Sequence, residues 1–287
     1  MPRLGVHTFV WAPEWDHRGA QTAIEGAAAA GVDVVEIPLL RPAEIDVAST
    51  KELAAAHGIA LTCSLGLPAH ATLPDHPAEA EKFLKQALEV TAALGARSLS
   101  GVTYATIGRL SGAPPTETEY TVIANTIRSV ARYAAGLGLM LGFEPCNRYE
   151  THLLNTGRQA VALIERIGEP NLFVHLDTYH MNIEEKGFEA AIVDAARYLK
   201  YIHLSESDRG TPGTGTVDWD GIFRGLARIK FDGDMVLESF VHLHPDIARA
   251  LAVWHPVAAG GSAEVIGKGL PFLRAKAHQH GVLRTKH

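Results

Sequence analysis

The sequence has few cysteines and lacks a long apolar run, and these absences exclude whole classes of protein. Its 287 residues include only Cys63 and Cys146, with no CxxC motif, so a disulfide-rich fold is excluded and both thiols are expected to be reduced. No stretch of about 20 apolar residues could span a bilayer. The first residues show no charged segment followed by a sustained apolar run, as a secretory signal would. We therefore expect a cytoplasmic protein with no membrane partner.

Charged residues are also sparse, and the balance is acidic. Lys and Arg number 26 against 32 Asp and Glu, which gives a formal net charge of −6. The basic residues are scattered and do not form the stripe that a nucleic-acid surface shows. Hydrophobic residues make up 47% of the chain, so a large core can be buried and disorder is not expected. The sequence thus predicts a folded protein with no nucleic-acid partner.

Short apolar runs alternate with longer amphipathic segments, which is the pattern of repeated β–α units. The apolar runs do not alternate with polar residues, and this is typical of strands in a buried parallel sheet. Strands are expected at 4–10, 32–37, 59–65, 98–102, 139–144, 172–177, 198–203 and 235–238. Helices are expected at 21–30, 49–57, 77–94, 117–137, 156–167, 187–196, 219–228, 245–257 and 263–278.

Eight such units follow one another without a linker and without a glycine-rich phosphate loop after the first strand. This even series favours a closed barrel over a doubly wound sheet. The length also suits a barrel, for which about 250 residues is typical. We predict an α/β fold in which residues 1–287 form one domain, a single (β/α)8 TIM barrel with parallel strands.

Four consecutive expected strands, the fifth to the eighth, each end on a residue that can bind a metal. These residues are Glu144, Asp177, His203 and Glu238. In a parallel barrel the carboxyl ends of the strands converge on one face, where active sites lie. Ionised carboxylates at the ends of buried strands are costly unless they are paired or bound to metal, and three close together repel one another. A divalent cation held by the four side chains resolves this repulsion.

The chemistry of the four side chains indicates which cation they would hold. Three carboxylates and one imidazole, without a thiolate, favour Mn2+ or Mg2+, with Co2+ able to substitute, over structural zinc. Taken singly, each acid would more often be a helix cap or a salt-bridge partner, and His203 a structural histidine. Their combination on adjacent strands is what indicates a site.

More polar residues follow the same four strands closely. They are Asn147, Arg148, Glu150, His180, Glu206 and Arg209. This density of charge at the loop starts of one barrel face is not typical of surface decoration. Arg148 and Glu206 fit a supporting ion pair at least as well as a substrate contact. Residues 182–185, which include Glu184 and Glu185, are expected in a solvated loop.

Several separated motifs resemble the ketose 3-epimerases, within the sugar isomerase and epimerase superfamily that includes xylose isomerase. The motifs are Glu-Pro-Cys-Asn-Arg-Tyr-Glu at 144–150, His-Leu-Asp-Thr-Tyr-His-Met-Asn-Ile-Glu-Glu at 175–185, His-Leu-Ser-Glu-Ser-Asp-Arg-Gly at 203–210 and Leu-Glu-Ser-Phe at 237–240. With Gly5-Val6-His7 and Trp11, the resemblance spans nearly the whole chain. It implies an isomerase of the carbohydrate epimerase class, and a homodimer or homotetramer.

The resemblance also implies a reaction and roles for individual residues. A free ketose would be inverted at C3, as in the pairs D-fructose and D-allulose, D-tagatose and D-sorbose, or L-ribulose and L-xylulose. Glu144, Asp177, His203 and Glu238 would hold one divalent cation per subunit, most readily Mn2+. Glu144 and Glu238 would also remove and return the C3 proton. Substrate contacts would come from Glu150, His180, Arg209, His7 and Trp11, with Gly66 and Tyr104 in the same region.

The residues leave other functions open. An aldose–ketose or hydroxypyruvate isomerase would use the same barrel and metal. An endonuclease-IV-like repair enzyme shares the barrel, but it would need further His and Asp ligands and a basic face. A non-catalytic barrel would bind a sugar without exchanging its proton. The preferred ketose is not predicted, because a single methylene or hydroxyl in the pocket can decide it.

Overall fold

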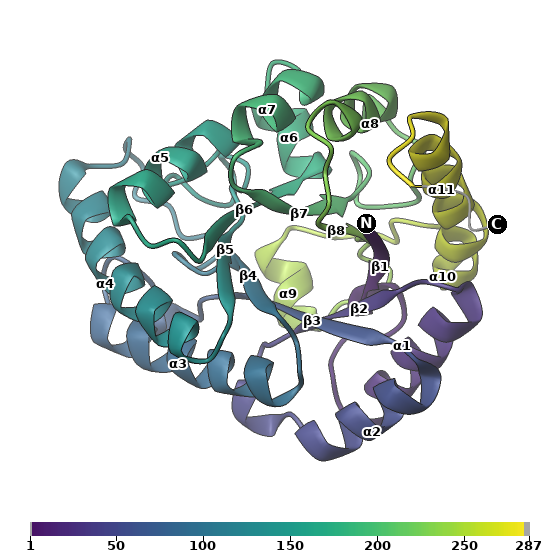
Figure 1. Cartoon of the computed structure of the whole chain (residues 1–287), viewed down its shortest axis with the longest axis horizontal. Coiled ribbons are helices and arrows are strands. Elements are labelled where there is room, and N and C mark those ends of the chain that lie inside the picture. Colours follow the sequence, from purple (N-terminus) through teal and green to yellow (C-terminus); the bar gives the residue numbers. More distant parts are fainter. Residues whose placement is uncertain (1, 284–287) are drawn as a thin grey trace.

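The computed structural model describes residues 2–283, in which eight parallel strands close into one barrel inside a ring of helices (Figure 1). Each strand pairs with the next in the chain, and the first closes the ring by pairing in parallel with the last. The strands are β1 (Arg3–His7), β2 (Val34–Pro38), β3 (Ala60–Gly66), β4 (Ser98–Val102), β5 (Met140–Phe143), β6 (Leu172–Asp177), β7 (Leu199–Leu204) and β8 (Asp234–Leu237). The predicted (β/α)8 TIM barrel is confirmed.

The longer helices of the described residues form the outer layer (Figure 1), and their buried residues pack toward the strands. They are α1 (His17–Ala30), α2 (Val47–His57), α3 (Pro77–Ala93), α4 (Glu117–Gly136), α5 (Gly157–Ile167), α6 (Thr178–Glu184), α7 (Phe188–Ala195), α8 (Trp219–Arg228), α9 (Pro245–Ala250), α10 (Gly261–Glu264) and α11 (Leu270–Gln279). In Figure 1 the short helix α9 lies inside the ring that the longer helices make. Within residues 2–283, no helix is both long enough and apolar enough for a bilayer crossing.

Three of the differences from the sequence-based boundaries bear on the surroundings of the strand ends. The first strand ends at His7, because His7 Nδ1 accepts the Phe9 N–H and starts a 3-10 turn over Thr8–Val10. Residues 178–184 form helix α6, where a loop was expected, since Asp177 caps the first backbone N–H groups of this segment. The helix expected at 245–257 ends at Ala250. Pro256 lies within that range, and a proline disfavours helical backbone at the residue before it.

One layer of side chains inside the barrel is polar, and it is formed by Glu36, Tyr201 and His203. Glu36 on β2 contacts Tyr201 and His203 on β7, although these strands are not neighbours in the barrel. The hydrogen bonds therefore cross the barrel from one side to the other. All three side chains are buried. This layer lies directly against the strand ends that carry the predicted metal ligands, so the fold surrounds those ligands with further polar groups.

Candidate active site

The four predicted metal ligands meet at the carboxyl ends of β5 to β8. His203 Nδ1 lies 3.5 Å from Asp177 Oδ2, 3.5 Å from Glu238 Oε1 and 3.7 Å from Glu144 Oε1. This nitrogen is buried and has no hydrogen-bond partner among the described residues. Three hard carboxylate oxygens around one unpartnered imidazole nitrogen form a donor set that divalent cations take. The residues present therefore fit a divalent cation.

Arg209 brings a permanent positive charge to the same cluster. Its Nη1 donates to Asp177 Oδ2 at 2.6 Å and also to Glu238 Oε2. The guanidinium lies between two rings, 4.0 Å from the centroid of Tyr179 and 4.5 Å from that of Phe240. Its backbone φ of 62° is rare for a residue other than glycine. Such a conformation persists where the surroundings hold it in place, and it is frequent at functional sites.

The buried charges move one another's pKa values in opposite directions. Burial alone would raise the pKa of Asp177, but Arg209 and His203 hold that pKa well below its ordinary value. Burial raises the pKa of Glu238 well above its ordinary value, against the opposing effect of His203 and Arg209. Burial would lower the pKa of His203, yet Glu238 and Glu36 raise it well above the ordinary value. Neighbouring carboxylates of one cluster thus differ in their tendency to hold a proton.

His180 and Glu150 lie beside Glu144, as expected. The Asn147 backbone N–H donates to His180 Nδ1 at 3.1 Å, so the neutral ring carries its proton on Nε2. This Nε2 lies 3.1 Å from Arg209 Nη2 and 3.7 Å from Glu144 Oε1. Burial, helped by Arg209, lowers the pKa of His180 to about 4, so the ring is a neutral hydrogen-bond donor. Burial raises the pKa of Glu150 to about 6.

These side chains form one end of a cavity of about 610 Å³. The rest of its wall is largely apolar and comes from the loops after the first four strands, from Phe240 and from helix α9. The apolar lining includes Phe9, Leu67, Pro68, Ile107, Phe240, Ile247 and Leu251. The cavity therefore has a charged end that can polarise a ligand and an apolar end that can only shape it.

His7 lines this cavity, but Trp11 does not appear among the described lining residues. The Trp11 indole packs against Gly26 of helix α1. The contact is so close that a Cβ atom at residue 26 would lie 2.6 Å from Trp11 Nε1. The expected substrate contact from Trp11 is therefore corrected. The cause is the 3-10 turn after His7, which ends the strand alternation that would have carried Trp11 to the barrel mouth. Gly66 lies in the cavity wall, and the buried Tyr104 hydroxyl donates to the Glu144 carbonyl at 2.9 Å.

Arg148 is paired outside the cavity. Its Nε and Nη2 each lie 2.9 Å from a carboxylate oxygen of Glu184, and its backbone N–H also donates to that carboxylate at 2.7 Å. The Glu184 side chain is only 6% exposed, and Glu185 accepts the Gly157 N–H at 2.9 Å. The expected solvated loop is wrong at these two residues, because helix α6 turns both glutamates toward neighbouring segments.

Glu206 is a buried carboxylate that organises the loop between β7 and α8. Its oxygens accept hydrogen bonds from the backbone N–H groups of Ser207, Gly213 and Val217 and from the Trp219 indole, at 2.8–3.2 Å. Arg209 belongs to this loop. The interpretation of Glu206 as a supporting residue thus fits the structure better than a substrate contact, and its hydrogen-bond partners are three backbone amides and the Trp219 indole, in place of the expected ion pair.

The sequence reasoning missed Glu36. Its Oε2 accepts a hydrogen bond from Tyr201 Oη at 2.6 Å and lies 2.7 Å from His203 Nε2. A signal was present, because Glu36 is a lone carboxylate within the apolar strand Val34–Pro38, and a glutamate is almost never fully buried without a partner. The partner itself could not be read from the sequence, since it comes from the opposite side of the barrel.

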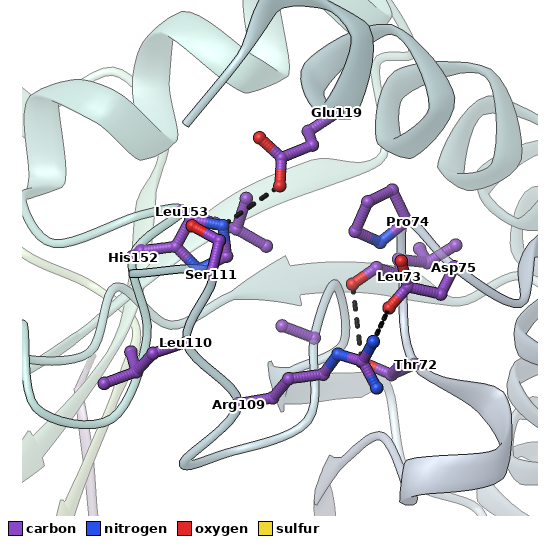
Figure 2. A pocket seen from close by; sticks show the side chains of 11 residues that line it. Thr72, Leu73, Pro74, Asp75, Arg109, Leu110, Ser111, Glu119, His152 and Leu153 are labelled. Atoms are coloured by element: carbon purple, nitrogen blue, oxygen red, sulfur yellow. Dashed lines mark hydrogen bonds and ion pairs between the residues drawn. The ribbon is translucent and has the colours of Figure 1, made fainter. Parts of the chain in front are cut away.

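A second, smaller pocket of about 120 Å³ shares no lining residue with this cavity. Figure 2 shows its charged side chains already paired, Arg109 with Asp75 and His152 with Glu119. These pairs leave it without a convergent set of unpartnered groups. The cavity at the strand ends is therefore the candidate active site.

Comparisons with known proteins agree with this geometry. The family model described as xylose isomerase-like TIM barrel matches residues 24–275. An L-ribulose 3-epimerase of Methylomonas sp. is 39% identical over 278 residues, which cover 95% of this chain and 96% of that protein. A ketose 3-epimerase of Arthrobacter globiformis is 41% identical over 280 residues, 96% of each chain. The crystal structure of a D-allulose 3-epimerase from Methylomonas sp. in complex with D-allulose is similar with a TM-score of 0.92 at 37% identity, covering 96% of this chain and 97% of that one.

Proposed function

The chain belongs to the ketose 3-epimerases of the xylose isomerase-like TIM barrel family, which makes it an isomerase, and we propose that it inverts free ketohexoses or ketopentoses at C3 with the help of a divalent cation. The observation that carries the proposal is the cluster around His203 Nδ1. Glu144 and Glu238 reach this atom from strands that are not neighbours, at 3.7 and 3.5 Å. The proposed substrate pairs are D-fructose and D-allulose, D-tagatose and D-sorbose, and L-ribulose and L-xylulose.

Glu144 and Glu238 are the proposed proton carriers. Inversion at C3 requires that a proton leave one face of the ketose and that a proton arrive on the other face. Each glutamate directs its Oε1 toward His203 Nδ1, which leaves Oε2 for the proton; in Glu238 this Oε2 also accepts from Arg209 Nη1. One glutamate would remove the C3 proton from one face, and the other would supply a proton to the opposite face. The roles exchange when the reaction runs in reverse.

The proposed cation is Mn2+, with Mg2+ or Co2+ able to substitute, because the donor set is mostly carboxylate oxygen. One cation per subunit would be held by Glu144, Asp177, His203 and Glu238. When bound, it supplies Lewis-acid stabilisation of the negative charge that develops on the ketose oxygens as the proton leaves. A homodimer or homotetramer is part of the same proposal and follows from the family resemblance alone.

His180 and Arg209 are proposed to orient the carbonyl end of the ketose. His180 Nε2 and Arg209 Nη2 lie 3.1 Å apart, and both carry hydrogens, so neither satisfies the other. These two donors suit acceptor oxygens of a ligand, and we assign them to the ketose oxygens at C1 and C2. Glu150 accepts the Asn147 amide at 2.8 Å with one oxygen, and its other oxygen is assigned to a sugar hydroxyl.

Solvent exchange tests the proposal. The Mn2+-loaded protein is incubated with D-fructose, D-tagatose and L-ribulose in D2O, and the position of deuterium is read by NMR. Deuterium at C3 is expected with at least one of the three sugars, and none in a sample treated with a chelator. Deuterium only at C1 would instead identify an aldose–ketose isomerase. Sugar binding without deuterium uptake would identify a non-catalytic barrel.

A further inference from the structure

Glu36 is a buried carboxylate that the proposed reaction does not use. It lies in the middle of β2 and is fully buried, and its contacts are histidine and tyrosine side chains, with no lysine or arginine among its partners in residues 2–283. Its Oε2 lies 2.7 Å from His203 Nε2 and accepts the Tyr201 hydroxyl at 2.6 Å. Since an unpartnered charge at this depth is costly, the two hydrogen bonds are what keep the carboxylate there.

The contact with Glu36 decides which nitrogen of His203 carries the hydrogen. An ionised carboxylate can only accept, so in the neutral His203 ring, the form that can bind a cation, the hydrogen must lie on Nε2. This leaves a lone pair on Nδ1, the buried atom that has no hydrogen-bond partner among the described residues and faces the carboxylates of Asp177 and Glu238. We infer that Glu36 is a positioning residue for the cation site: it fixes His203 as the Nε2–H tautomer and directs Nδ1 at the cation. The inference rests on the proposed metal site.

His7 extends this arrangement toward the cavity wall. The Phe9 N–H donates to His7 Nδ1 at 3.1 Å, so the neutral ring of His7 also carries its hydrogen on Nε2. His7 Nε2 lies 3.7 Å from Glu36 Oε1, an oxygen with no hydrogen-bond partner among the described residues. One carboxylate therefore faces both a metal ligand and a histidine that lines the cavity, and it orients the two rings relative to each other.

Tyr201 provides the matched control, because it donates to the same oxygen of Glu36 as His203 does. If Glu36 served only to satisfy buried hydrogen bonds, loss of the Tyr201 hydroxyl and loss of the carboxylate would affect the protein in similar ways. A positioning role predicts that the two substitutions change cation affinity by different amounts. Tyr201→Phe leaves the carboxylate on His203 and preserves cation binding, whereas Glu36→Leu removes the acceptor that fixes the tautomer.

Cation affinity is the first measurement. The metal-stripped full chain is titrated with Mn2+ by calorimetry in the wild type, Glu36→Leu, Glu36→Gln and Tyr201→Phe. Removing the carboxylate behind a metal-binding histidine typically weakens binding by about 10- to 100-fold, and we expect this for Glu36→Leu. Glu36→Gln should lose less, because its amide oxygen can still accept from Nε2–H. Tyr201→Phe should stay within about 3-fold of the wild type, well below the loss that the carboxylate deletion gives.

The tautomer is the second measurement, and a merely structural role would not move it. With diamagnetic Mg2+ bound, 15N NMR of the His203 ring should show a hydrogen on Nε2 and none on Nδ1 in the wild type and Glu36→Gln. In Glu36→Leu the Nε2–H proton has lost its carboxylate acceptor, so its resonance should move upfield and exchange faster with solvent, and at equal Mg2+ concentration a smaller fraction of the rings should show a hydrogen-free Nδ1.

The outcomes separate this inference from the proposed function. A wild type that binds neither Mn2+ nor Mg2+ overturns the metal site and the inference with it. A folded Glu36→Leu that binds Mn2+ as tightly as the wild type overturns the inference alone. If Glu36→Leu does not fold, Glu36→Gln decides: weaker Mn2+ binding than in Tyr201→Phe supports the inference, and equal or tighter binding overturns it.

Discussion

The two halves of the barrel contribute opposite chemistry to one cavity. Strands β5 to β8 end on three carboxylates and an imidazole, while the loops after β1 to β4 contribute apolar side chains such as Phe9, Leu67 and Ile107. Both halves are built from the same parallel pairing and the same buried strands. The difference therefore lies in a few residues at the strand ends, and the barrel itself only brings them together.

Glu36 is the exception to this division. It belongs to the apolar half, yet its carboxylate crosses the barrel to His203 in the charged half. The two halves of the barrel therefore differ at the cavity surface. In the barrel interior below that surface, the hydrogen bond between Glu36 and His203 joins them. Substitutions in the two halves are expected to differ in the size and in the kind of their effect.

The largest effect is expected from the glutamates of the charged half. Glu144→Gln and Glu238→Gln each remove a proposed proton carrier and proposed cation ligand while keeping the shape of the side chain. We expect kcat to fall by about 10³-fold or more in each, since proton transfer by a positioned side chain alone contributes about 10²- to 10⁴-fold. The measurement is turnover of D-fructose, D-tagatose and L-ribulose at saturating Mn2+, with circular dichroism to verify folding. Glu184→Gln, on helix α6, is the matched control and should retain activity. A near-wild-type rate in either active-site variant would contradict the two-glutamate account.

A smaller but still large loss is expected for Arg209→Lys. Lysine keeps the positive charge but loses the planar fork that lies at once against Asp177, Glu238 and the ring of His180. We expect kcat/KM to fall by about 10²-fold, as for the loss of one donor at a developing negative charge. The surface variant Arg224→Lys, which changes exposed pairs with Glu189 and Asp218, should leave the rate unchanged. Equal rates in the two variants would mean that charge alone suffices at this position.

The sequence could predict the features of this site that depend on residues close together in the chain. It could not predict those that depend on contacts between distant segments. The strands and the clustering of the four candidate ligands were predictable, because apolar runs ending in Glu144, Asp177, His203 or Glu238 are patterns within a few residues. Trp11 was placed wrongly, because its direction depends on a 3-10 turn that begins at His7.

Contacts across the barrel were out of reach for the same reason. The bond between Glu36 and His203 joins residues 167 positions apart, and no pattern within either strand specifies it. Helix α6 was missed because a cap and a metal ligand were treated as alternatives for Asp177, although its carboxylate caps the segment that follows while it also faces His203. A residue such as Asp177, which is both a candidate ligand and a helix cap, therefore has one role that the sequence pattern does not reveal.

An intermediate effect is expected for Glu206→Gln, which tests whether the charged half depends on its supporting loop. The carboxylate accepts four hydrogen bonds, and a glutamine would turn an NH2 group toward some of those donors. We expect a loss of about 1–3 kcal/mol in the free energy of unfolding, measured in urea, because buried donors are left unsatisfied. Because Arg209 is carried by the same loop, kcat/KM should also fall, by less than in Arg209→Lys. Unchanged stability and activity would show that the loop holds its shape without this anchor.

The smallest effect is expected in the apolar half. Ile247→Ala on helix α9 removes three carbon atoms from the cavity wall and no hydrogen-bonding group. We expect kcat to change by less than about 3-fold, while the ratio of kcat/KM between a ketohexose and a ketopentose shifts by up to about 10-fold, because apolar contacts discriminate weakly. Arg249→Ala on the same helix is the control, since this side chain is 72% exposed and pairs with Asp246, a surface residue. If Ile247→Ala instead stopped turnover at every sugar, the apolar wall would take part in the chemistry and the division between the two halves would fail. A shift in the kcat/KM ratio with kcat preserved would support the division between the halves. The charged half would then set the rate, and the apolar half would select the ketose.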